Sequence, residues 1–149
     1  MDRPSIHEFV GGDEAFLAFT TAFHARCLTD PVLEHPFSHP GNPDHVERLA
    51  EYWAEVFGGP PTYSERHGGH SAMLEIHARQ GAEEDLGERF VAAFLGAADD
   101  AGFPHDPEFR ETLASYIAWA IGDVLAVSPT DAAVEPGLAM PRWGWNGPA

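Results

Sequence analysis

Three histidines stand beside apolar or aromatic residues and are the first candidates for chemistry. His24 directly follows Phe23, His45 lies four residues before Leu49, and His77 closes a short apolar run. A lone imidazole in such a place is usually a boundary side chain whose nitrogens are satisfied by its neighbours. Three of them, on three segments that must meet in one small domain, instead favour a common site.

The motifs that the sequence lacks narrow the chemistry of that site. It contains no His-Glu-x-x-His, no Glu-x-x-His pair, no phosphate-binding glycine loop and no Gly-x-Ser-x-Gly. The apolar stripes of the expected helices carry no carboxylate, which excludes the commonest bundle with a two-metal core. An apolar, aromatic-rich pocket with a single coordinating imidazole is what haem requires. The residues therefore favour a haem site.

Composition and charge exclude several other classes. The chain has 149 residues, with 24 acidic and 8 basic side chains and a net charge of −16. Such a charge repels a phosphate backbone, so nucleic-acid binding is disfavoured. No run approaches the roughly 18 uncharged apolar residues of a membrane helix, and the start lacks the apolar region of a signal peptide. The single cysteine, Cys27, excludes an intrachain disulfide. We expect an acidic cytoplasmic protein.

Breakers and apolar periodicity predict an all-α fold of four long and two short helices. One apolar stripe follows Asp13, an N-cap candidate, and Asp106-Pro107 is a typical helix start. The long helices are expected at residues 13–29, 42–57, 82–100 and 107–127. A proline-rich loop is expected at 31–41, and a long loop precedes a short helix at 72–77. No stretch alternates over the length of a strand.

The chain divides into one domain and a tail. Residues 1–128 hold all the expected helices, whereas 129–149 are proline-rich. We expect the tail to be an irregular C-terminal extension packed on the body through Trp143 and Trp145. The same tryptophans could instead form a homodimer contact.

Several local patterns, in the same order and at consistent gaps, resemble the group II truncated (two-over-two) haemoglobins of actinobacterial type. Gly11-Gly12-Asp13-Glu14-Ala15-Phe16 is similar to the entry of the family's helix B, and Thr29-Asp30-Pro31-Val32-Leu33 to the end of that segment. Gly58-Gly59-Pro60-Pro61-Thr62-Tyr63-Ser64 is similar to the turn after helix E and is the most specific match. The resemblance covers residues 5–128. It implies a globin-like two-over-two helical sandwich with a long loop before the proximal helix.

The resemblance also implies haem b and assigns its contacts. His77, followed by Ala78, would be the protein ligand of the iron, and His24 and His45 would face the bound ligand on the distal side. The cofactor-binding positions fall into two groups. Distal or apolar contacts are Phe37, Leu49, Tyr52, Trp53 and Phe90, and residues near the propionates are Arg48, Tyr63 and His70. The family usually has tyrosine at position 24, tryptophan at 90 and Pro-Phe after the proximal His-Ala, where this chain has Arg79-Gln80.

These assignments imply a haem b protein that binds dioxygen or another small diatomic ligand, such as nitric oxide or carbon monoxide. An alternative within the same fold is a haem-dependent redox enzyme, acting on peroxide or detoxifying nitric oxide with a reductase as partner, because a distal imidazole can shuttle a proton. An alternative from another class is a haem-free all-α interaction domain whose acidic surface meets a basic partner. The colour of the purified protein distinguishes these classes, because a haem protein is red and a haem-free domain is colourless.

Overall fold

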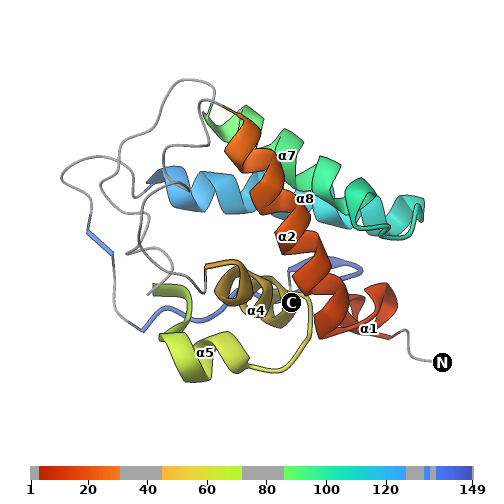
Figure 1. Ribbon diagram of the computed structural model, residues 1–149. Helices are drawn as coiled ribbons and strands as arrows, with labels where there is room; N and C mark the ends of the chain where they lie inside the picture. Colours follow the sequence, from red (N-terminus) through yellow and green to blue (C-terminus); the bar gives the residue numbers. More distant parts are fainter. Residues whose placement is uncertain (1–3, 31–44, 72–85, 127–132, 135–136, 149) are drawn as a thin grey trace.

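The computed structural model of the chain describes residues 4–30, 45–71, 86–126, 133–134 and 137–148 (Figure 1). Within them the elements are α1 (Ile6–Val10), α2 (Asp13–Thr29), α4 (His45–Val56), α5 (Thr62–His67), α7 (Leu86–Asp100), α8 (Pro107–Ala126), β1 (Trp143–Gly144) and β2 (Gly147–Pro148). Helix α2 packs on α4, α7 packs on α8, and α2 also crosses α7. The expected all-α two-over-two sandwich is confirmed. No helix among these residues is long and apolar enough to cross a membrane.

The core between the two helix pairs is aromatic. The predicted stripe of α2 is buried, and its Phe19 and Phe23 reach across to the other helices. The ring of Phe19 lies 5.3 Å from Trp53 of α4 and 4.9 Å from Phe94 of α7, and Trp53 lies 5.0 Å from Phe94. Such edge-to-face pairs each add about 0.5–1.5 kcal/mol beyond the burial of their area. These contacts fix α2, α4 and α7 relative to one another.

The start of α2 differs from the prediction in its cap. Gly12, not Asp13, is the N-cap residue, and both Gly11 and Gly12 have positive φ. This turn brings the short helix α1 against α2 and places His7 beside Asp13, with 2.7 Å between Nε2 and Oδ1. The Asp13 carboxylate therefore contacts His7 and does not cap α2. Helix α1 was not predicted, because five residues are too few to show a period.

The other predicted boundaries agree where the structure describes them. Helix α8 begins at Pro107, as its cap-then-proline start indicates, and α7 ends at Asp100. The expected loop 31–41, the short helix 72–77 and the first residues of the helices predicted at 42–57 and 82–100 lie outside the described residues. Helix α5 lies in the stretch before residues 72–77 where a long loop was expected, so part of that stretch is helical.

A buried carboxylate closes the turn between α4 and α5. Glu55 is 1% exposed, its Oε1 accepts the backbone N–H of Ser64 at 2.9 Å, and its Oε2 accepts the Ser64 hydroxyl. The N-cap residue of α5, Pro61, makes no side-chain cap of its own. Glu55 therefore supplies the missing acceptor for the first turn of α5. The sequence analysis did not single out Glu55, because it considered only the apolar stripe of this helix, whereas all of residues 52–57 are buried.

The tail lies on the body through its tryptophans. Trp143 is buried, with its ring 5.5 Å from Tyr116, and Trp145 donates from Nε1 to the carbonyl oxygen of Pro4 at 2.9 Å. The strands β1 and β2 pair in an antiparallel ladder of two residues each, turned with the help of a positive φ at Gly147. The sequence indicated no strand here, because two residues cannot show an alternation.

Candidate functional site

Helix α4 carries four of the predicted cofactor contacts, which form two neighbouring rows along the helix. Arg48 and Tyr52 form one row and Leu49 and Trp53 the other, because residues four apart share a helix face. Leu49 is half-buried, whereas Tyr52 and Trp53 are 4% and 3% exposed. His45 is the first residue of this helix. The side chain of His45 lies outside the described part of the chain, as do Phe37 and His77, so their assignments stay predictions.

Arg48 of α4 holds a donor that is shielded from solvent. Its Nε is shielded from solvent and has no hydrogen-bond partner among the described residues. A buried unsatisfied donor costs about 1–3 kcal/mol, and more when the group is charged. Tyr63 of α5 lies close enough that the positive charge of Arg48 lowers the pKa of its hydroxyl, against the larger effect of burial, which raises that pKa. The arrangement suits a carboxylate ligand, which the planar guanidinium recognises with several donors.

His70 has protein partners on both sides of its ring. It is buried, with Nδ1 2.9 Å from the Tyr52 hydroxyl and Nε2 2.7 Å from Oδ2 of Asp123 on α8. Both ring nitrogens therefore have protein partners, and this geometry favours a link between α4 and α8 over a contact with a propionate. Of the three residues predicted near the propionates, Arg48 and Tyr63 are the pair that the structure brings together.

Phe23 of α2 connects two other predicted positions. Its ring centroid lies 5.2 Å from Trp53 and 4.9 Å from Phe90 of α7. His24, the next residue on α2, is half-buried at the edge of the same face. The predicted positions 53 and 90 thus meet around one buried phenylalanine.

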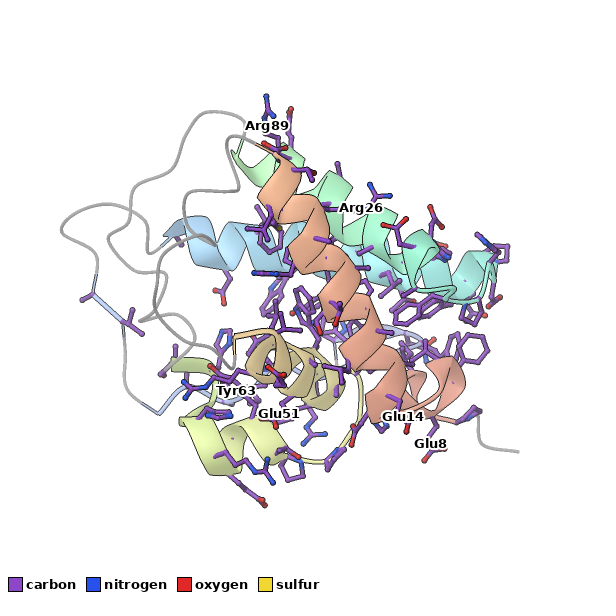
Figure 2. The ribbon with its side chains drawn as sticks, viewed as in Figure 1. Glu8, Glu14, Arg26, Glu51, Tyr63 and Arg89 are labelled. Carbon is purple, nitrogen blue, oxygen red and sulfur yellow. The ribbon has the colours of Figure 1, made fainter. Side chains whose placement is uncertain are left out.

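Charged contacts hold these helices in place. Figure 2 shows Arg26 of α2 beside α7, where its guanidinium pairs with Asp100 through two hydrogen bonds, at 2.5 and 3.0 Å. At the other end of α7, Arg89 contacts Asp30 at 2.9 Å. Glu51 on the outer face of α4 receives hydrogen bonds from α5. The packing of α2 on α7 and of α4 on α5 therefore rests on both aromatic and ionic contacts.

The sequence analysis gave no functional role to Asp123 or Tyr116. Both lie on α8 and both face α4: Tyr116 is buried and packs on Phe57, and Asp123 reaches His70. The signal was present, because Asp123 is seven residues after Tyr116 and so shares its inward helix face. A carboxylate at that position was passed over because the apolar residues alone defined the stripe.

The sequence profile of the bacterial-like globins matches residues 5–126, the segment from α1 through α8. The chain belongs to this family. Membership makes it a haem-binding globin of the truncated, two-on-two type, as its sequence patterns indicated.

Solved structures similar to this globin agree with that assignment. A haemoglobin from Chloroflexus aurantiacus is 30% identical, with 83% of this chain and 98% of that chain covered and a TM-score of 0.71. A thermostable haemoglobin from Thermobifida fusca is 28% identical over the same shares, with a TM-score of 0.69. The group II truncated haemoglobin of Bacillus anthracis shares the fold at 20% identity, with 89% and 98% covered and a TM-score of 0.73.

A curated relative is the two-on-two haemoglobin-3 of Arabidopsis thaliana. It is 28% identical over 92 residues, which are 60% of this chain and 52% of the relative. The chain thus matches about half the length of that plant protein.

Proposed function

We propose that this globin holds haem b against α4 and binds dioxygen or another small diatomic ligand, with His77 as the iron ligand. The observation that carries the proposal is the buried Nε of Arg48, which has no acceptor among the described residues and lies beside Tyr63. A haem propionate is a carboxylate on an apolar ring, so it would satisfy this donor while the ring meets the apolar surface of Leu49 and Phe90.

The described residues fit such a group, and each has a defined task. When bound, haem supplies an iron atom with a coordination position for a small ligand. Arg48 and Tyr63 would orient the propionate side, and Leu49 and Phe90 would keep water from the ring. His24, half-buried at the edge of α2, would donate a hydrogen bond toward the ligand, with His45 as the second distal donor.

A redox enzyme acting on peroxide or nitric oxide is the second candidate, with a reductase as its electron donor. One observation favours it: Tyr52 and Trp53, two oxidisable side chains, are buried in the same helix that carries Arg48 and Leu49. We further propose a cytoplasmic location, no nucleic-acid or membrane partner, and a homodimeric assembly.

Hemin titration tests the proposal. We expect the purified chain to take up hemin with an intense Soret band. Arg48→Gln should release hemin about tenfold faster than the wild type, since a hydrogen bond to a charged group contributes about 1.5–3 kcal/mol. Arg66→Gln is the matched control, because Arg66 is exposed on α5 and contacts Glu51 only through one nitrogen. A chain that does not bind hemin would contradict the proposal and favour the alternative of a haem-free interaction domain.

A further inference from the structure

A row of three hydrogen-bonded side chains, two of them buried, joins α4 to α8 in a way that haem binding does not require. The Tyr52 hydroxyl lies 2.9 Å from Nδ1 of His70, and Nε2 of His70 lies 2.7 Å from a carboxylate oxygen of Asp123. The Asp123 side chain is 34% exposed, whereas Tyr52 and His70 are buried. Because a carboxylate only accepts, the neutral ring carries its proton on Nε2, and Nδ1 accepts the proton of Tyr52.

This row suits the one-electron oxidation of a phenol. A tyrosine that loses an electron becomes strongly acidic, and a buried one can pass its proton only to a base within hydrogen-bond reach. His70 is that base, and the positive charge that it gains faces the Asp123 carboxylate. Burial raises the pKa of Tyr52 well above its usual range, so its proton stays in place until the electron leaves.

Aromatic rings connect Tyr52 to the surface. Trp119 of α8 is 42% exposed, and its ring centroid lies 6.4 Å from His70 and 6.2 Å from Tyr116. Burial raises the pKa of the Tyr116 hydroxyl, and hydrogen bonding toward Trp53 and Tyr52 partly offsets that rise, which places the hydroxyl near both side chains. Short steps between oxidisable rings allow an electron to move from a donor at the exposed Trp119 to the buried side chains of α4, and the helices need not separate.

We propose that Tyr52 is a redox-active tyrosine that delivers electrons to hydrogen peroxide in the pocket. A small phenol then reduces the oxidised Tyr52 through Trp119. The proposal rests on the haem function above and names its redox partners. In each step Tyr52 loses one electron to the pocket and its hydroxyl proton moves to His70. A phenol at Trp119 returns one electron, His70 returns the proton, and the phenol releases its own proton to solvent. Two such steps reduce one peroxide, with two protons, to two waters and leave two phenoxyl radicals.

Electron paramagnetic resonance tests this assignment without relying on turnover. Hemin-loaded protein grown with ring-deuterated tyrosine is mixed with hydrogen peroxide and frozen, and a tyrosyl signal is expected. Tyr52→Phe should abolish that signal in samples of equal Soret absorbance. A tyrosyl signal of full intensity in Tyr52→Phe, or no tyrosyl signal in the wild type, would overturn the proposal.

Two further variants separate a proton acceptor from a structural support. Asp123→Asn should lower the radical yield several-fold, whereas Glu111→Gln, an exposed acid on the same helix, should leave it unchanged. Equal yields in these two variants would refute the role of the row. The Soret band of each sample reports its hemin content separately. If the chain takes up no hemin, light-driven oxidation by a ruthenium tris-bipyridine complex with persulfate applies the same test. Loss of the radical in Tyr52→Phe would then support the redox tyrosine even though the haem proposal had failed.

Discussion

Replacing Gly59 by alanine tests how tightly the turn after α4 is built. A Cβ at this position would lie 2.7 Å from the carbonyl oxygen of Ala54 and 2.8 Å from Cδ2 of His7. The Ala54 oxygen already accepts the backbone N–H of Gly59 at 2.8 Å. This oxygen therefore cannot move away from the new Cβ without breaking that hydrogen bond. The substitution must therefore displace α1 or distort the end of α4. Overpacking of this kind costs about 1–3 kcal/mol.

Gly122→Ala is the matched control on α8. A Cβ there meets no atom of the described residues within 4 Å, and the residue is helical. Alanine should stabilise this helix by about 0.5–1 kcal/mol relative to glycine. The two variants make the same chemical change and should shift the stability in opposite directions.

Urea unfolding at a fixed excess of hemin measures both effects, because bound ligand adds the same free energy to all variants that bind hemin with the same affinity. For a chain of this size, 1 kcal/mol corresponds to roughly 2–4 °C in the melting temperature. A Gly59→Ala protein as stable as the wild type would refute the steric reasoning. So would a Gly122→Ala protein that loses as much stability as Gly59→Ala.

Three more predictions concern single side chains. His77→Ala should remove the bond between protein and iron, and added imidazole should restore a five-coordinate ferrous spectrum; unaltered spectra would assign the ligand to another histidine. If His45 coordinates the ferric iron, the wild type is low-spin at neutral pH, and His45→Ala should become high-spin and bind ligands faster, whereas His24→Ala should mainly speed ligand loss. A high-spin wild type would make both histidines hydrogen-bond donors only. Burial, with a smaller contribution from the Asp30 charge, raises the pKa of the Cys27 thiol to about 12. The folded protein holds this proton more tightly than the unfolded chain, so the protonated thiol adds to the free energy of unfolding. That contribution is complete below about pH 9 and is lost as the pH rises toward 12, which lowers the free energy of unfolding by at most about 4 kcal/mol. Unfolding free energies between pH 9 and 11 should thus fall more steeply in the wild type than in Cys27→Ala, and parallel slopes would contradict the shift.

The sequence alone determined the helical class, the start of α8, the buried stripe of α2 and the family, because these depend on neighbouring residues. A proline after an aspartate starts a helix whatever it later packs against, and phenylalanines repeated every three or four residues form one face. The sequence also predicted that Arg48, Tyr63, Trp53 and Phe90 belong to one site. It had no means of predicting α1, since five residues show no period, or the capping role of Glu55.

Only the tertiary structure decided what His70 does. Its partners Tyr52 and Asp123 lie 18 and 53 residues away in the sequence and come from two different helices. Their meeting depends on how α4 and α8 pack through the aromatic core, which no local pattern encodes. The same holds for the buried Nε of Arg48: burial is a property of the assembled surfaces, and a sequence shows only that the side chain can donate.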